Sequence, residues 1–399
     1  MSDIEKKVTE EAEMPKDKKK KKKALVILLP ILAVFLALII AVVAFVAHKF
    51  SLIDFDDDES TTINPTQEFV DNENEQIDFG EMDDATGNDF REILKNWATN
   101  GGEKMSNRDI INVLLIGSDA SAEEAGRANI TEKGNTDVMM LVSINQIDDT
   151  IKLVSFMRDS YTYMDQFDRY AKLNAACANG GPAYLVETIE NDYKIEIDGY
   201  AMVDFDSFRQ VIDVLGGVNV DVPAYVANHL NKGVLKNNKI ESGNGVLLDG
   251  EQALHFSRVR KTDADGDISR VARQRQVVNA LIQKAKGATL TEINEVADVM
   301  LANVRTNISK KSIISYASKA ITEGWANYEI TEVTMPTPDT RYGYSSKATA
   351  WIWVVDYPLA AQKTQLEIYG ETNINLEEEN RKTAVTVVGG YVSKKTADN

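Results

Sequence analysis

The chain has 399 residues, is 43% hydrophobic and carries 62 acidic against 44 basic side chains, which gives a formal net charge of −18. This charge argues against a nucleic-acid partner, because the neutralisation of phosphates needs a basic surface. Cys177 is the only cysteine, and His48, His229 and His255 are far apart in the sequence, so we expect no intrachain disulfide, no cysteine metal site and no histidine cluster.

The N-terminal segment has the pattern of a membrane anchor. Residues 16–23 hold seven lysines, and residues 24–47 carry no charge. At ~1.5 Å per residue, a helix of that length crosses the ~30 Å hydrocarbon core, and the run is longer than the ~7–15 apolar residues of a cleaved signal peptide. We therefore expect an uncleaved transmembrane helix at 24–47, with residues 1–23 in the cytoplasm and the chain after His48 outside the cell membrane.

An acidic linker is expected at 48–88. Residues 51–90 contain fourteen Asp or Glu and no Lys or Arg, and such a stretch repels itself and cannot bury enough apolar surface to fold. A helix near 89–99 then opens the folded domain, which we expect to span 89–370. Residues 371–399 are mostly polar and are expected to form a loose C-terminal tail.

The folded part has a pattern typical of an α/β protein. Apolar runs predict strands at 111–117, 137–144 and 150–155, with a tight turn at Asp148-Asp149 between the last two. The remaining elements are expected in this order: helices at 182–191 and 205–215, a strand at 218–222, helices at 249–260, 268–286, 293–304 and 309–322, a strand at 330–335 and a helix at 356–369. This alternation predicts a single domain with a central mixed β-sheet flanked by helices.

Two aspartates stand at the ends of predicted strands. Asp119 follows the first strand, and Asp137 begins the second. Such carboxylates project from the sheet edge at which α/β proteins bind their ligands. Two of them could hold Mg²⁺, which takes one or two carboxylates and leaves its other positions to water and phosphate oxygens. The alternative is that each Asp only caps a turn.

Further charged residues follow the third strand. Arg158 could bind a phosphate through two hydrogen bonds, with Asp159 holding its guanidinium in place, and Lys172 could add a point charge. The alternative is a surface ion pair, and such pairs contribute little to stability.

The densest group of arginines lies around the start of the helix expected at 268–286. Five arginines precede or begin this helix: Arg258, Arg260, Arg270, Arg273 and Arg275. Asp267 stands at the expected N-cap, and Arg270 and Gln274, four residues apart, share one face. Because a helix N-terminus already favours an anion, the stretch predicts a phosphate site. The alternative is a solvated helix with charges on its outer face.

A series of blocks in this order resembles the LytR-CpsA-Psr family. The first five are INVLLIGSD (111–119), NTDVMMLVS (135–143), VSFMRD (154–159), KLNAA (172–176) and IDVLGGV (212–218). The last and most specific block is Arg258-x-Arg260, followed by Asp267-x-x-Arg270-x-x-x-Gln274. The resemblance covers roughly residues 90–370.

The resemblance implies a membrane-anchored enzyme of Gram-positive bacteria whose α/β domain lies outside the cell. It implies transfer of a glycopolymer, such as teichoic acid or capsule, from a polyprenyl diphosphate carrier to peptidoglycan. By the same resemblance Asp119 and Asp137 hold magnesium. Four arginines contact the diphosphate and are oriented by Asp267 and Gln274: Arg158, Arg258, Arg260 and Arg270.

The chemistry of the residues agrees with this implication. Displacement at a diphosphate needs neutralised nonbridging oxygens and a positioned acceptor hydroxyl. Arginines and Mg²⁺ supply the first, and Asp159 or Asp267 is the candidate that accepts the hydroxyl proton. Two alternatives stay open: a hydrolase that uses water as acceptor, and a non-catalytic lipid-binding or regulatory envelope protein.

One position departs from the family pattern. The family usually has Arg two residues before the second metal Asp, and this chain has Asn135 there. Arg127 and Lys133 are the nearest preceding cations, and Arg127 is the better replacement because its guanidinium can bind two phosphate oxygens at once. We therefore hypothesise that Arg127 folds back over the site. The alternative is an exposed loop charge.

Overall fold

The computed structural model describes residues 54–55, 84–118, 136–259, 262, 267–287, 289–346, 349–376 and 382–397. The chain divides into two compact units, residues 1–52 and residues 53–399, and every described residue belongs to the second. The expected cytoplasmic stretch and transmembrane helix therefore lie outside the described residues, as does most of the acidic linker. Among the helices that the structure does describe, none combines the length and apolar character needed to cross a membrane.

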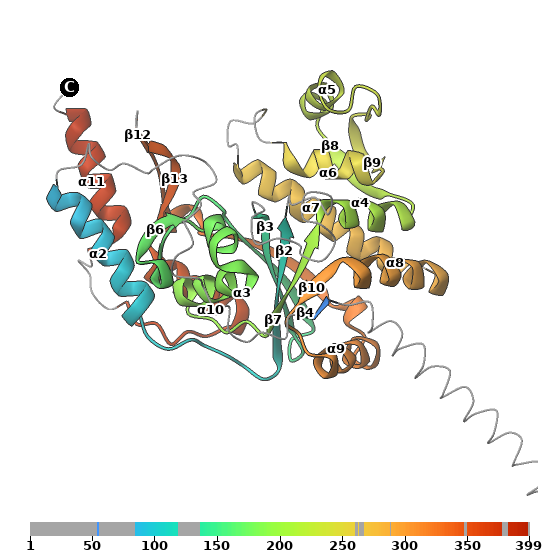
Figure 1. The fold of residues 1–399 in the computed structure, drawn as a ribbon, viewed down its shortest axis with the longest axis horizontal. Coiled ribbons are helices and arrows are strands. Elements are labelled where there is room, and N and C mark those ends of the chain that lie inside the picture. Colours follow the sequence, from blue (N-terminus) through green and yellow to red (C-terminus); the bar gives the residue numbers. More distant parts are fainter. Residues whose placement is uncertain are drawn as a thin grey trace, which may run out of the picture. The chain divides into compact units, whose positions relative to one another are not determined.

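A mixed β-sheet forms the centre of the second unit (Figure 1). Within the described residues it has seven strands in the order β1-β10-β7-β2-β3-β4-β11. Their bounds are β1 Asp54–Phe55, β2 Ile110–Ser118, β3 Thr136–Asn145, β4 Thr150–Phe156, β7 Gly199–Asp204, β10 Val304–Thr306 and β11 Glu329–Met335. The prediction of an α/β fold around a mixed sheet is confirmed, as are the three strands that open it.

The order and direction of the strands define one edge of the sheet, here called the carboxyl edge. Strands β2, β7, β4 and β11 end at this edge, and β3, which is antiparallel to β2 and β4, begins there. At the edge Ser118 pairs with Thr136 on one side and with Asp204 on the other. Residues that follow β4 therefore lie near the first residues of β3.

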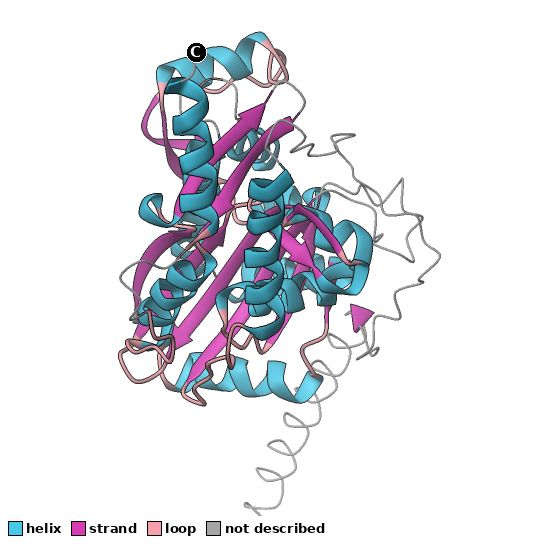
Figure 2. Ribbon diagram, turned by 90° about the vertical axis from the view of Figure 1, so that its left-hand side faces the viewer, coloured by secondary structure: helices cyan, strands magenta, loops and turns pink. Residues whose placement is uncertain are grey.

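Helices cover both faces of the sheet (Figure 1). One layer consists of α2 Asp84–Asn100, α3 Asn174–Tyr193, α10 Tyr357–Tyr369 and α11 Ala384–Ala397. In Figure 2 this layer lies in front of the strands. The other layer consists of α4 Phe205–Val214, α6 Gly250–Arg258, α7 Asp267–Lys286 and α8 Leu290–Asn303. Alternate residues of β2 face the two layers, since Leu114 packs in the first core and Leu115 lines a cavity on the other side.

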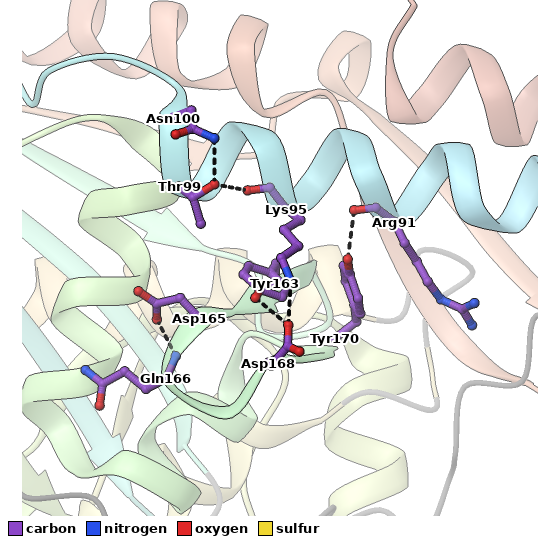
Figure 3. Close-up of polar contacts among 9 residues, drawn as sticks. All are labelled: Arg91, Lys95, Thr99, Asn100, Tyr163, Asp165, Gln166, Asp168 and Tyr170. Atoms are coloured by element: carbon purple, nitrogen blue, oxygen red, sulfur yellow. Dashed lines mark hydrogen bonds and ion pairs between the residues drawn. The ribbon is translucent and has the colours of Figure 1, made fainter.

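Shorter elements surround these layers. They are the hairpins β5 Tyr161–Met164 with β6 Arg169–Lys172, β8 Val218–Val222 with β9 Gly243–Leu248, and β12 Arg341–Ser346 with β13 Thr349–Val355, and the helices α5 Ala224–Lys232 and α9 Lys310–Thr322. Polar contacts fix α2 to the β5–β6 hairpin (Figure 3). Lys95 and the Tyr163 hydroxyl both donate to Oδ1 of Asp168, at 2.6 and 2.7 Å, and the Tyr170 hydroxyl donates to the Arg91 carbonyl at 3.0 Å.

Some expectations differ from the structure. Helix α2 begins at Asp84, earlier than the helix expected near 89–99 and within the linker expected at 48–88. The loose tail expected at 371–399 is wrong for residues 384–397, which form α11 and bury Ala384 and Val388 in the core that α2 shares. Packing on its neighbours stabilises this segment despite Gly389 and Gly390, which lower its intrinsic helix propensity. The helix expected at 182–191 begins earlier, at Asn174, because two helical segments meet at Gly181, whose φ is 75°.

Candidate active site

Asp137 lies at the centre of a cluster of cations at the carboxyl edge. Its Oδ1 accepts a hydrogen bond of 2.7 Å from Nη1 of Arg158 and lies 3.6 Å from Nη1 of Arg270. Its Oδ2 lies 3.6 Å from Nη2 of Arg258. Because the three arginines follow β4, end α6 and begin α7, elements distant in the sequence place their guanidinium groups around one carboxylate.

A second carboxylate, Asp159, joins the same cluster. Its Oδ1 lies 3.3 Å from Nζ of Lys172, and its Oδ2 lies 3.8 Å from Nε of Arg158. Arg158 and Asp159 are 5% and 3% exposed, so the alternative of a surface ion pair does not hold. Removing one member of a buried ion pair leaves an uncompensated charge in the interior, which strongly destabilises the folded protein.

Helices α6 and α7 are held so that their arginines reach Asp137. Asp249 caps α6 through a capping box with Gln252, and α6 ends at Arg258. Arg273 of α7 donates to the Val259 carbonyl, which fixes the chain directly after Arg258. Gln274 donates at 3.2 Å to the backbone carbonyl of Asp137.

The N-terminal turn of α7 contributes one cation, Arg270, to the cluster. Arg270 is the fourth residue of this helix, and it is 1% exposed. It lies on the same face as Gln274, as the spacing predicted, since both side chains contact Asp137. The helix therefore contributes a buried guanidinium and the positive end of its dipole to the same point, an arrangement that favours a bound anion.

An apolar cavity of about 350 Å³ opens beside this cluster. The sheet, α4, α7 and α8 supply most of its walls: Leu115, Met140, Val203, Phe208, Leu215, Val278, Leu281, Ile282 and Val296. Two residues join the cavity to the cations. Gln274 lines the cavity and donates a hydrogen bond to the backbone carbonyl of Asp137. Phe205 also lines the cavity, and the centroid of its ring lies 4.5 Å from the guanidinium carbon of Arg258.

The structure thus brings together most of the residues that the sequence singled out: Asp137, Arg158, Asp159, Lys172, Arg258, Arg270 and Gln274. Asp119, Arg127, Asn135 and Arg260 lie outside the described residues, so the proposals about them stay predictions. Asp267 is the first residue of α7 rather than its N-cap, and its side chain is outside the described part.

Two residues of the site had no assigned role in the sequence. Phe205 was missed because strand β7 before it was not predicted, and only its parallel pairing with β2 brings it to the carboxyl edge. Arg273 stood among the five arginines, but nothing in the sequence shows that it bonds the chain after Arg258.

The model of the LytR_cpsA_psr family matches residues 73–367. The polyisoprenyl-teichoic acid--peptidoglycan teichoic acid transferase TagU of Bacillus anthracis is 32% identical over 269 residues, which cover 66% of this chain and 80% of that protein. Two solved structures of TagT, one of the B. subtilis protein and one bound to LI-WTA, superpose with TM-scores of 0.51 and 0.53 at 26% identity, over 67% of this chain and 93% of theirs.

Proposed function

Since this chain belongs to the LytR_cpsA_psr family, as the match over residues 73–367 shows, we propose that it transfers an anionic glycopolymer of the teichoic acid or capsule type from a polyprenyl diphosphate carrier to peptidoglycan. The relatives named as teichoic acid transferases support this proposal. The observation that carries it is the direct connection, through Gln274 and Phe205, between a cation cluster and an apolar cavity.

The two halves of this site match the two halves of the donor. A polyprenyl diphosphate joins a strongly anionic head to an apolar tail, and each buried CH₂ of such a tail contributes about 0.8 kcal/mol. The head fits the guanidinium groups of Arg158, Arg258 and Arg270, because arginine binds two phosphate oxygens at once. The tail fits the cavity between the sheet and helices α4, α7 and α8.

The reaction is a displacement at phosphorus. An acceptor hydroxyl attacks the phosphorus that carries the glycan, the bond from that phosphorus to the bridging oxygen breaks, and the polyprenyl phosphate leaves. The arginines stabilise the negative charge that spreads over the phosphate oxygens. Lys172 adds a cation on the far side of Asp159, and Asp159 and Asp267 are the two candidates that accept the hydroxyl proton.

A magnesium ion is part of the proposal. The described residues hold no group of three or more His, Cys, Asp or Glu that could bind a metal alone. Magnesium does not need one, because it is commonly held by one or two carboxylates together with phosphate oxygens and water. Asp137 fits as such a ligand, since its Oδ2 lies 3.6 Å from Arg258, beyond hydrogen-bond distance. Asp119, the residue after β2, would be the second ligand, and the bound ion would neutralise phosphate oxygens.

The cellular placement is also proposed. The uncharged run 24–47 after seven lysines supports an N-terminal anchor with a cytoplasmic start and an extracellular catalytic domain. The carrier lipid and the enzyme would then share the outer surface of one membrane, and peptidoglycan would lie within reach of the domain.

The proposal is tested by incubating the full-length protein with carrier-linked glycan, peptidoglycan and Mg²⁺. We expect a glycan–peptidoglycan conjugate and free polyprenyl phosphate, and we expect chelation of the metal or Asp119→Ala to stop both. Release of sugar phosphate without a conjugate would identify a hydrolase instead. Binding of the carrier without any turnover would identify a lipid-binding protein.

A further inference from the structure

The β12–β13 hairpin carries an aromatic surface that the donor site does not use, here called the tryptophan platform: Arg341, Gly343, Trp351 and Trp353. Trp351 is 48% exposed, and its ring packs edge-on against Trp353 with the centroids 5.3 Å apart. The guanidinium carbon of Arg341 lies 4.6 Å from the Trp353 ring. A Cβ at Gly343 would lie 2.4 Å from Cη2 of Trp351, so the glycine leaves the space that this ring occupies.

The platform is joined to the cation cluster by its backbone. The Trp353 N–H donates to the Asp159 carbonyl at 2.9 Å, and Ser160 and Trp353 form a parallel β-bridge. Arg341 reaches the same segment, since its Nη1 lies 3.1 Å from Sδ of Met157. The hairpin is therefore hydrogen-bonded directly to the segment that carries Arg158 and Asp159, the two residues at the proposed reaction centre.

The position of the platform relative to the cavity indicates what it could bind. The cavity lies over β7, β2 and β3, the cation cluster lies where β3 and β4 meet the edge, and the hairpin adjoins the chain after β4. In Figure 1, β12 and β13 accordingly lie on one side of β3, while α6 and α7 lie on the other. When the carrier lipid occupies the cavity, the acceptor substrate can approach the cation cluster from the side on which the platform lies.

We propose, on the basis of the proposed function, that the tryptophan platform binds sugar rings of the acceptor glycan and aligns a hydroxyl with the diphosphate. Sugar rings present apolar C–H faces together with hydroxyl groups, and a tryptophan offers a large apolar face with an N–H donor. Arg341 forms no ion pair with a carboxylate of the described residues, so its guanidinium can also meet an acidic group of the glycan.

The test titrates the full-length protein with a tetramer of β-1,4-linked N-acetylglucosamine by calorimetry. We expect Trp351→Ala to weaken binding at least about tenfold, because the substitution removes the large apolar ring face on which the sugar would pack. Gly343→Ala should weaken it as well, since the added Cβ displaces the Trp351 ring. Tyr225→Ala is the matched control, because it removes a 51% exposed aromatic side chain from α5, and it should bind the tetramer as the wild type does.

Binding of polyprenyl diphosphate is measured in the same variants and should stay unchanged, which separates the platform from the donor site. If the wild type binds the donor but not the tetramer, or if folded Trp351→Ala binds the tetramer normally, the proposal is overturned while the proposed function stands.

Discussion

Arg158 donates a hydrogen bond of 2.7 Å from Nη1 to Oδ1 of Asp137, so the chain after β4 is fixed to the start of β3. The two strands form an antiparallel pair, and their register brings both residues to the carboxyl edge. Their side chains are 6% and 11% exposed. The contact therefore organises the cluster before any substrate arrives, and a phosphate would meet a guanidinium that is already oriented.

The first prediction concerns this pair. Asp137→Ala leaves buried guanidinium groups without their central carboxylate, and we expect a loss of about 3–5 kcal/mol in the free energy of unfolding. Inorganic pyrophosphate should raise the free energy of unfolding of the variant more than that of the wild type, because it replaces the missing negative charge. The measurement is denaturant unfolding with and without pyrophosphate.

The matched control is Asp206→Ala. Asp206 pairs with Arg209 on α4, and both side chains are 40% exposed, so its loss should cost no more than about 1 kcal/mol. Equal effects of the two substitutions would show that the Asp137 cluster has no special electrostatic role.

The second prediction separates the lipid tail from the diphosphate. Val278 of α7 lines the apolar cavity, and Val278→Phe should fill part of it. We expect weaker binding of polyprenyl diphosphate and unchanged binding of inorganic pyrophosphate, because the cations are untouched. Calorimetric titration of both ligands checks this, with Ile314→Phe, a change at a 50% exposed position on α9, as the control. Parallel losses for both ligands would argue against a tail in this cavity.

The third prediction uses the single cysteine. Burial raises the pKa of the Cys177 thiol to about 11. At pH 8 only about one thiol in a thousand would be the reactive thiolate. Iodoacetamide should therefore label the folded protein very slowly and the guanidinium-unfolded protein quickly. Labelling of the folded protein at the rate of a free cysteine would contradict the buried placement.

The fourth prediction concerns the buried Asp192, which accepts from the Thr162 hydroxyl at 2.9 Å. Burial raises the pKa of its carboxyl from 3.8 to about 7. Between these values the native state holds a proton that the unfolded state releases, so this group lowers stability as the pH rises from about 4 to 7. Above pH 7 both states are ionised and its effect is constant.

Asp192→Asn removes this titration and keeps an acceptor for Thr162. We expect the variant to gain stability relative to the wild type at pH 8 and to gain much less at pH 5. Thermal unfolding of both proteins at the two pH values gives the comparison. A difference in melting temperature that does not change with pH would show that Asp192 is already ionised at pH 5.

Apolar runs and residue spacing predicted the longer strands and helices, whose sequences have a clear pattern of their own. The runs that form β2, β3 and β4 are apolar enough to be recognised without their partners, and the four-residue spacing of Arg270 and Gln274 placed both on one face of α7. Strand β7 and the hairpins β5–β6 and β12–β13 are short, and their pairing depends on distant residues such as Ser160 with Trp353. Helix α11 was missed because packing on α2 stabilises it more than its own sequence does.

The sequence predicted the charged part of the candidate site but not its apolar part. The charged residues were predicted because arginines together with strand-end carboxylates indicate a phosphate site. The cavity was not, because Val278 and Leu281 of α7 have the same apolar pattern whether they fill a core or line an empty space. The contacts of Phe205 with Arg258 and of Gln274 with Asp137 could not be predicted either, because they depend on the order of the strands in the sheet, which sequence periodicity does not give.

The most direct test of the central claim compares two arginines of one helix. Arg270 faces Asp137 and is 1% exposed, whereas Arg275 pairs with Glu332 at 3.1 Å, away from the cluster. The rate of glycan transfer from polyprenyl diphosphate to peptidoglycan is measured for Arg270→Lys and Arg275→Lys, with circular dichroism to confirm folding. Because a charged hydrogen bond contributes about 1.5–3 kcal/mol, we expect Arg270→Lys to transfer roughly ten to a hundred times more slowly and Arg275→Lys to match the wild type. Transfer at the wild-type rate by Arg270→Lys would contradict the assignment of this cluster as the diphosphate site.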